Sequence, residues 1–305
     1  MRPRDRERSI EIDEALLSFH QEQHPLPGIE DQNRREALIE QMVESIRRVS
    51  YVRTLGERDT SPRRTDPADE MFDPLRAALL HQRAGNLDEA YWLVFLAVHF
   101  GKSARTGWRT TAEVYGQLGD GRWDWARTSR DPTAFRQWLA THQDKLRQNA
   151  GFGNHRKYQS LRASSRTGTG ATVESYVQWV EPSRTHADLM SEALRQSDGD
   201  VRVAFHALYR SMNSVVGFGR LGRFDYLNMV SNLGLSPIES GSTYMTGATG
   251  PVLGARLLFA ADLPPRTLDK RLIELESQLG VGMQVIEDAL CNWQKSPDSF
   301  VPFRG

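Results

Sequence analysis

The sequence has one cysteine, no net charge and no long apolar run. Its single thiol, Cys291, excludes an internal disulfide, a four-cysteine zinc site and a four-cysteine iron–sulfur cluster. The longest nearly continuous apolar stretch, residues 91–100, is too short to cross a bilayer, and the N-terminal residues lack the apolar segment of a secretory signal. We therefore expect a cytoplasmic protein with no membrane association, metal, cofactor or obligate protein partner.

The balance of charge hides an uneven distribution along the chain. Residues 101–170 carry 13 basic and 5 acidic side chains, whereas acidic side chains predominate on both sides of this basic island. Aromatic residues such as Trp108, Trp123 and Phe152 are interspersed among the cations. Cations that meet phosphates and rings that meet bases are typical of a nucleic-acid surface. The alternative is a solvated helical region that is rich in arginine and salt bridges.

Spacings of three and four between apolar residues predict helices, and five or more alternating apolar and polar positions are hard to find. The fold class predicted is therefore all-α, with little or no sheet. We expect an N-terminal helical region over 1–171 and a second region over 172–305, either as two domains or as one globule. The clearest individual segments are two helices over 10–52 divided by Pro25 and Pro27, a loop over 56–73, helices over 74–83 and 87–100, and a helix starting at Pro132.

The basic island contains a glycine-rich loop, residues 149–171, with positive charge and no apolar period. It is suited to holding phosphates and to stacking beside a displaced base, although an ordered surface loop is the simpler interpretation. The candidate DNA contacts in this loop are Asn154, His155, Arg156, Lys157 and Tyr158.

Three further side chains have two interpretations each. Arg220 and Arg223 lie beside glycines before an apolar helix, where they either hold a phosphate or pair with a carboxylate such as Asp225. His99 ends an apolar helix, and a core histidine is the commoner explanation than a catalytic one.

Near the C-terminus, a glycine-rich hairpin over 247–251 opens into an apolar helix. The free amides of a helix start bind anions, and glycine lets a phosphate approach, so Gly247, Thr249 and Gly250 are candidates for gripping a DNA backbone. After Pro264 and Pro265 a second helix is expected to begin at about Asp269. Asp269 is either a simple helix cap or a catalytic carboxylate.

This arrangement resembles the helix-hairpin-helix DNA glycosylases, in which an aspartate about 20 residues beyond the hairpin starts the next helix. The resemblance implies a bundle of that type with an N-terminal helical extension, a hairpin that holds the DNA backbone, and Asp269 as the catalytic group. Bifunctional members carry a lysine in the hairpin helix, and no lysine lies between Gly247 and Arg266. A monofunctional enzyme is therefore implied.

The strings WLVFLAVHFGK, GFGNHRKYQSL, LYRSMNSVVGFGRLGRFDYL and GATGPVLGARLLF are similar to a narrower helical family, alpha-glutamyl/putrescinyl thymine pyrophosphorylase. The resemblance implies double-stranded DNA with modified bases, such as glucosylated hydroxymethylcytosine, as the partner, and excision in anti-phage defence as the activity. Two alternatives remain: an enzyme that hypermodifies DNA bases by displacing a pyrophosphorylated substituent, and a non-catalytic DNA-binding module. Two adjacent helical faces carry Glu287, Asp288, Cys291 and Lys295, which are candidates for lining a base pocket. A cysteine at helical spacing is more commonly a small buried apolar group.

Overall fold

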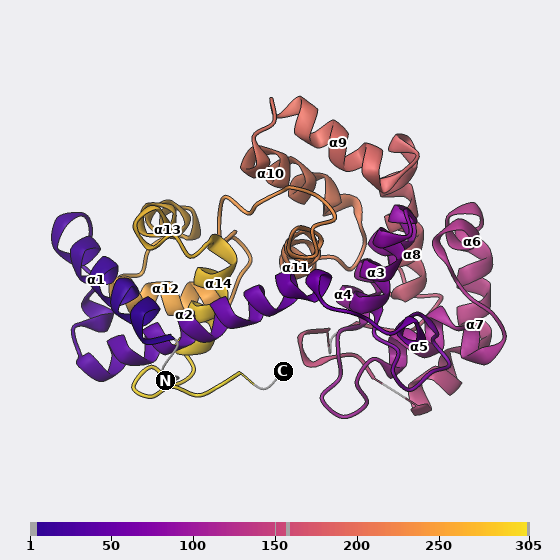
Figure 1. Ribbon diagram of the computed structural model, residues 1–305, viewed down its shortest axis with the longest axis horizontal. Helices are drawn as coiled ribbons and strands as arrows, with labels where there is room; N and C mark the ends of the chain where they lie inside the picture. The colour runs from indigo at the N-terminus through magenta and orange to yellow at the C-terminus, as the bar shows by residue number, and fades with distance from the viewer. Residues whose placement is uncertain (1–4, 150, 157–158, 304–305) are drawn as a thin grey trace. The chain divides into compact units, whose positions relative to one another are not determined.

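The computed structural model describes residues 5–149, 151–156 and 159–303 (Figure 1). Within these ranges the regular elements are fourteen α-helices and short 3-10 turns, and the one β contact is an isolated bridge between Ser103 and Gly107. The predicted all-α class is confirmed. No helix in the described part of the chain has both the length and the apolar character needed to cross a membrane.

The chain divides into two compact units. Unit 1 joins the two ends of the sequence, Met1–Val52 and Ser240–Arg304, whereas unit 2 is the continuous segment Arg53–Glu239. This division differs from the expected boundary between residues 171 and 172. The physical reason is a shared core: apolar side chains before residue 46 and after residue 244 pack into one cluster.

Unit 1 is built on that cluster, in which Leu16, Phe19, Leu272 and Ile286 are almost completely buried. Helices α12 and α14 form its most extensive pairing, and α1 packs on α13. Its helices are α1 (Arg6–Glu22), α2 (Gln32–Arg53), α12 (Gly250–Phe259), α13 (Pro265–Leu279) and α14 (Met283–Trp293), with a 3-10 turn at Pro27–Ile29 between the first two.

Unit 2 is organised around α4 (Leu87–Phe100), in which every residue from Ala90 to Phe100 is buried. A helix that is apolar on all sides must be covered on all sides, and α3, α5, α6, α9 and α11 pack against it. The other helices of the unit are α3 (Pro74–Arg83), α5 (Arg109–Tyr115), α6 (Trp125–Arg130), α7 (Pro132–Asn149), α8 (Thr169–Val180), α9 (His186–Gln196), α10 (Val201–Ser211) and α11 (Arg220–Asn232).

Local chemistry explains where these helices begin and end. Asp73 caps α3 by accepting the amide hydrogens of Leu75 and Arg76, and Pro74 occupies the first helical position, where no amide hydrogen is needed. Helix α4 ends at Gly101, whose φ of +68° favours glycine. The predicted bounds of 74–83 and 87–100 and the start at Pro132 are confirmed.

Candidate functional site

The predicted hairpin is a tight, exposed turn in unit 1. The Ala248 amide donates to the Met245 carbonyl at 2.9 Å, and this hydrogen bond closes a four-residue turn. Gly247, at the third position of the turn, has a φ of +83°. A positive φ at that position is the conformation that glycine adopts at little cost. Thr246, Gly247 and Thr249 are exposed, and Thr249 places no side-chain cap on the start of α12. The first amides of α12 are therefore not capped by the residue before them.

Two glycines of this segment are required by helix packing. A Cβ on Gly250 would lie 2.8 Å from the Cys291 Sγ, and one on Gly254 would lie 2.3 Å from the Leu290 carbonyl oxygen. Both contacts are with α14, so α12 and α14 approach each other closely where α12 lacks side chains. This packing is a reason for Gly250 that is independent of any phosphate.

Asp269 binds the stretch of chain that leads into the hairpin. Its Oδ1 accepts hydrogen bonds from the Ser242 hydroxyl at 2.9 Å and the Thr243 hydroxyl at 2.8 Å, and the Met245 amide lies 3.1 Å from each carboxylate oxygen. Helix α13 begins at Pro265, so the expected start at Asp269 is wrong by one turn, because proline is well suited to the first helical position. Asp269 therefore does not cap α13; it anchors the segment 242–245 to that helix.

The segment before the hairpin is not helical. Helix α11 ends at Asn232, and the described residues from there to Thr249 form turns and extended chain. The hairpin thus leads into α12 without directly following a helix, whereas the helix-hairpin-helix arrangement that the sequence resembles has a helix on each side of the hairpin.

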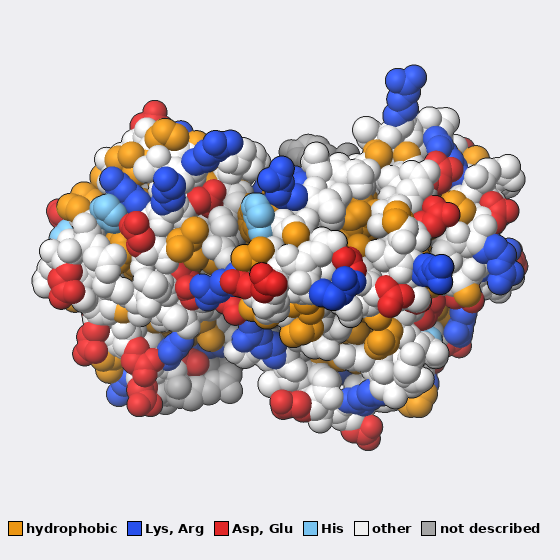
Figure 2. Space-filling model, turned by 90° about the horizontal axis from the view of Figure 1, so that it is seen from above, with side chains coloured by type: hydrophobic (Ala, Val, Ile, Leu, Met, Phe, Trp, Pro, Cys, Tyr) orange, Lys and Arg blue, Asp and Glu red, His pale blue; other side chains and the backbone are white. Residues whose placement is uncertain are grey.

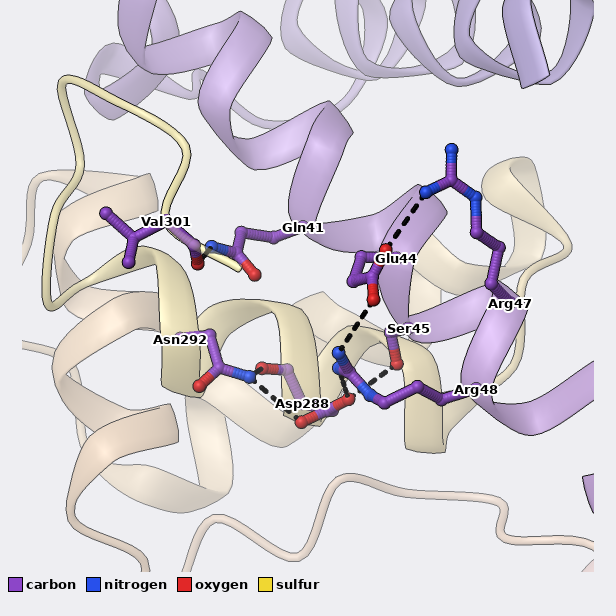
Figure 3. Close-up of polar contacts among 8 residues, drawn as sticks. All are labelled: Gln41, Glu44, Ser45, Arg47, Arg48, Asp288, Asn292 and Val301. Atoms are coloured by element: carbon purple, nitrogen blue, oxygen red, sulfur yellow. Dashed lines mark hydrogen bonds and ion pairs between the residues drawn. The ribbon is translucent and has the colours of Figure 1, made fainter. Parts of the chain in front are cut away.

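Asp288 lies in a polar network between α2 and α14 (Figure 3). Its Oδ2 accepts from the Ser45 hydroxyl at 2.7 Å and from Arg48, and its Oδ1 is 3.1 Å from the Asn292 amide nitrogen. Glu44 lies 3.9 Å from the Arg48 guanidinium and extends the network. Asp288 therefore joins the N-terminal and C-terminal parts of unit 1.

The basic loop in unit 2 is held against the end of α4. The Gly153 amide donates to the Phe100 carbonyl at 2.8 Å, and Asn154–Arg156 form a 3-10 turn. Arg156 is only 8% exposed; its Nε donates to the Val98 carbonyl at 2.8 Å and its Nη2 lies 2.7 Å from Asp225. Arg156 thus anchors the loop, while His155 is exposed. Lys157 and Tyr158 lie outside the described residues.

The other candidate cations of the sequence analysis and of the basic island contact aromatic rings or carboxylates. The Arg220 guanidinium lies 4.9 Å from the centre of the Phe224 ring, and that of Arg223 lies 4.3 Å from the Tyr209 ring. Asp225 pairs with Arg156, as described above. On the face in Figure 2, basic and acidic side chains are interspersed. Within the basic island, carboxylates pair with Arg109, Arg122, Arg136, Arg147 and Arg156.

His99 lies in the core of unit 2. It is 1% exposed, and its Nε2 is 2.9 Å from the Thr169 hydroxyl. Burial, aided by the charge of Arg156, lowers the pKa of His99 to about 3. The imidazole is therefore neutral at pH 7 and belongs to the packed core. A core role is the commoner explanation of a histidine at the end of an apolar helix.

A series of hydrogen-bonded, largely buried polar side chains in unit 2 was not predicted from the sequence. The Asp88 Oδ1 lies 2.7 Å from the His186 Nδ1, and the His186 Nε2 lies 2.8 Å from the Tyr176 hydroxyl, which is 2.8 Å from the Tyr226 hydroxyl. Burial lowers the pKa of His186 despite its carboxylate partner. One feature of the sequence could have indicated this network: the acidic pair Asp88 and Glu89 at the start of an otherwise apolar helix.

No three His, Cys, Asp or Glu side chains are grouped as metal ligands in the described part of the molecule. The arrangement that remains in unit 1 is an exposed hairpin, an uncapped helix start and a half-exposed carboxylate that holds the hairpin's base. These features define an all-helical protein with a candidate anion-binding turn beside an acidic group.

The chain belongs to the alpha-glutamyl/putrescinyl thymine pyrophosphorylase family, clade 3, whose family model matches residues 33–305. The match includes all of unit 2 and most of unit 1. Membership points to a function related to DNA base modification. Searches among curated proteins and among solved structures found no significant match.

Proposed function

We propose that the protein is a monofunctional DNA glycosylase, which hydrolyses the N-glycosidic bond of a flipped-out modified base in double-stranded DNA. Glucosylated hydroxymethylcytosine is the proposed type of base, and anti-phage defence the proposed role. The observation that carries this proposal is Asp269, whose carboxylate holds the residues that lead into an exposed glycine hairpin. Membership in a family concerned with modified thymine supports DNA as the substrate.

Hydrolysis of an N-glycosidic bond passes through a sugar with the character of an oxocarbenium ion. A carboxylate beside the sugar stabilises this positive charge and orients the attacking water. Among the described residues, the Asp269 Oδ2 accepts only the Met245 amide, whereas Oδ1 also accepts two hydroxyl groups. Oδ2 is therefore the oxygen that retains capacity to accept a hydrogen bond from water.

The other proposed contacts divide between the two units. In unit 1, the backbone at Gly247, Thr249 and Gly250 would hold a DNA phosphate through the amides at the start of α12. In unit 2, the proposed contacts are Asn154, His155, Lys157, Tyr158, Arg220 and Arg223. Arg156 is proposed to act indirectly, because its buried ion pair fixes the loop that carries His155.

A second candidate function rests on the family description. An enzyme that displaces a pyrophosphorylated substituent from a modified thymine would also need an anion-binding turn. A non-catalytic DNA-binding module is the third candidate, and in that case Asp269 serves only to hold the hairpin.

The test compares two aspartates that lie seven positions apart. The purified protein is incubated with unmodified, hydroxymethylated and glucosylated duplexes, and abasic sites are revealed by cleavage in alkali. We expect Asp269→Asn to slow abasic-site formation by about a hundredfold or more, the usual contribution of a general base. Asp262→Asn is the matched control, since this carboxylate is 85% exposed and pairs with Arg256. Its activity should match that of the unchanged protein.

Thermal unfolding followed by circular dichroism must show that Asp269→Asn remains folded, because the carboxylate also anchors residues 242–245. Full activity in a folded Asp269→Asn variant would contradict the proposed site. An additional duplex, in which the thymine methyl group carries a pyrophosphate, is incubated with an amine as nucleophile; release of pyrophosphate from it without abasic sites would favour the biosynthetic candidate. Binding without any product would favour the non-catalytic module.

A further inference from the structure

Residues 242–245 of unit 1 place three hydrogen-bond donors on one carboxylate, that of Asp269. The hydroxyl groups of Ser242 and Thr243 both donate to Oδ1, and the Met245 amide lies 3.1 Å from each of the two oxygens. The Thr243 side chain is completely buried. A carboxylate that accepts several donors is held in one orientation, because turning it breaks these hydrogen bonds together. The segment therefore fixes the direction of Asp269 as well as being anchored by it.

The Ser242 hydroxyl has one hydrogen, and the local chain determines where that hydrogen goes. The hydroxyl oxygen accepts the amide hydrogen of Tyr244 at 3.0 Å, a contact that serine commonly makes with the amide two residues further on. The hydroxyl hydrogen is directed at the Asp269 Oδ1, which lies 2.9 Å away. Ser242 is thus oriented by its own backbone before any substrate binds.

Tyr244 has a backbone conformation that bulky residues rarely adopt. Its φ is +51°, in the left-handed region, and its side chain is largely buried. Such conformations cost free energy, persist only where the surrounding structure fixes them, and are concentrated at functional sites. In this segment Tyr244 lies between the two hydroxyl donors and the amide donor, which all meet the same carboxylate.

Met245 connects the hairpin directly to the carboxylate. Its amide donates to Asp269, and its carbonyl accepts the Ala248 amide at 2.9 Å in the hairpin turn. The Met245 side chain is completely buried. One buried residue therefore sets the spacing between the exposed hairpin and Asp269. If the hairpin holds a phosphate of the strand whose sugar meets Asp269, this spacing decides whether the carboxylate reaches the sugar correctly.

We propose that Thr243 and Ser242 are positioning residues for Asp269. Their hydroxyl groups hold Oδ1, so that Oδ2 is presented to the water and the sugar. Neither residue touches the substrate; both act through the orientation of the carboxylate, and catalytic groups work only within a narrow range of geometry. This inference rests on the proposed glycosylase activity and adds to it the residues that orient its carboxylate.

The test measures kcat and KM for abasic-site formation in variants of the full-length protein. Thr243→Val keeps the shape of the side chain but removes the hydroxyl, and it should lower kcat by about tenfold to a hundredfold with KM unchanged. Thr243→Ser keeps the hydroxyl and should restore most of kcat. Thr172→Val is the matched control, because Thr172 is equally buried, belongs to unit 2 and donates to the Gly168 carbonyl at 3.1 Å. Its kcat should equal that of the unchanged protein.

Circular dichroism first establishes that each variant is folded. If Thr243→Val is not, Ser242→Ala replaces it, since the partly buried Ser242 donates to the same oxygen, and kcat should again fall with KM unchanged. A higher KM with unchanged kcat, no restoration by Thr243→Ser, or an equal loss in Thr172→Val would overturn the positioning role.

The outcome for Asp269 separates this inference from the proposed function. Activity that is lost in Asp269→Asn but retained in Thr243→Val and Ser242→Ala overturns the positioning role alone. Absence of abasic sites in every duplex with the unchanged protein overturns the proposed function, and the positioning role with it.

Discussion

Arg156 is a buried cation in unit 2, and the carboxylate of Asp225 lies 2.7 Å from it. Removing one partner of such a pair leaves a charge without compensation. We therefore expect Asp225→Asn to lower the free energy of unfolding by about 3 kcal/mol, at the low end for buried pairs because the Asp225 side chain is 37% exposed. Chemical denaturation measures this change.

The double variant Asp225→Asn with Arg156→Met is the control for this prediction. It removes the uncompensated charge while keeping much of the apolar stem, so it should recover part of the lost stability. If both variants lose the same amount, the pair does not act through its charge.

His99 makes the stability of unit 2 depend on pH. Its pKa in the folded protein is about 3, mainly because of burial, whereas that of an unfolded histidine is near 6.5. The unfolded chain therefore binds the proton first, and stability is fully present above pH 6.5 and lost as the pH falls below it. We expect a loss of about 1.4 kcal/mol for each pH unit well below 6.5.

Urea denaturation at pH 7, 6 and 5 measures this slope, and His99→Gln should reduce it without abolishing it. Part of the slope remains because burial also lowers the pKa of His186. An unchanged slope in His99→Gln would show that His99 does not titrate during unfolding.

At the scale of elements, the contact between α12 and α14 tests why Gly250 is glycine. Its missing Cβ faces the Cys291 Sγ at 2.8 Å, so Gly250→Ala should destabilise the protein by about 1–3 kcal/mol through overpacking. Cys291→Ala removes that sulfur, and the next atom is 3.7 Å away. The double variant should therefore recover most of the lost melting temperature. Gly219→Ala is the control, because no atom lies within 4 Å of its Cβ position.

The double variant also separates packing from DNA binding. Restored folding with unchanged affinity for duplex DNA would assign Gly250 to packing alone, whereas restored folding with lost affinity would support the proposed phosphate contact. No recovery of folding would mean that the Cys291 sulfur is not what excludes a side chain at Gly250.

The sequence predicted elements well where local chemistry determines them. The bounds of α4 follow from a continuous apolar stretch that ends at Gly101, and the start of α3 follows from Asp73 and Pro74. The partners of Asp269 were not predictable, because they lie 24 to 27 positions earlier in a segment with no regular pattern. The buried state of Arg156 was missed for a similar reason, since Asp225 is 69 positions away.

For the whole molecule, the continuity of unit 2 leads to a direct prediction. Because Arg53–Glu239 contains its own buried helix and the helices that cover it, this segment should fold when produced alone. We expect a helical circular dichroism spectrum and one cooperative thermal transition. A fragment without a cooperative transition would show that unit 2 depends on unit 1.

The division into units is the part of the fold that local patterns could not reveal. In unit 1, the Trp293 indole donates to the Arg34 carbonyl at 3.1 Å, across 259 positions of sequence. Periodicity identifies each helix and its apolar face but does not specify which distant face covers it. The N-terminal and C-terminal segments both contain helices with an apolar face. Only the shared core of the folded protein shows that these faces pack against each other.

Unit 1 is formed by two segments that are far apart in the sequence, and this has a consequence for biosynthesis. A ribosome completes unit 2 before it has made residues 240–304, so unit 2 is free to fold first. Until then, the apolar faces of α1 and α2 have no partner from the C-terminal segment and are surfaces that chaperones recognise. The hairpin and Asp269 are synthesised after the whole of unit 2, and the core that supports them assembles only when translation of residues 240–304 is finished.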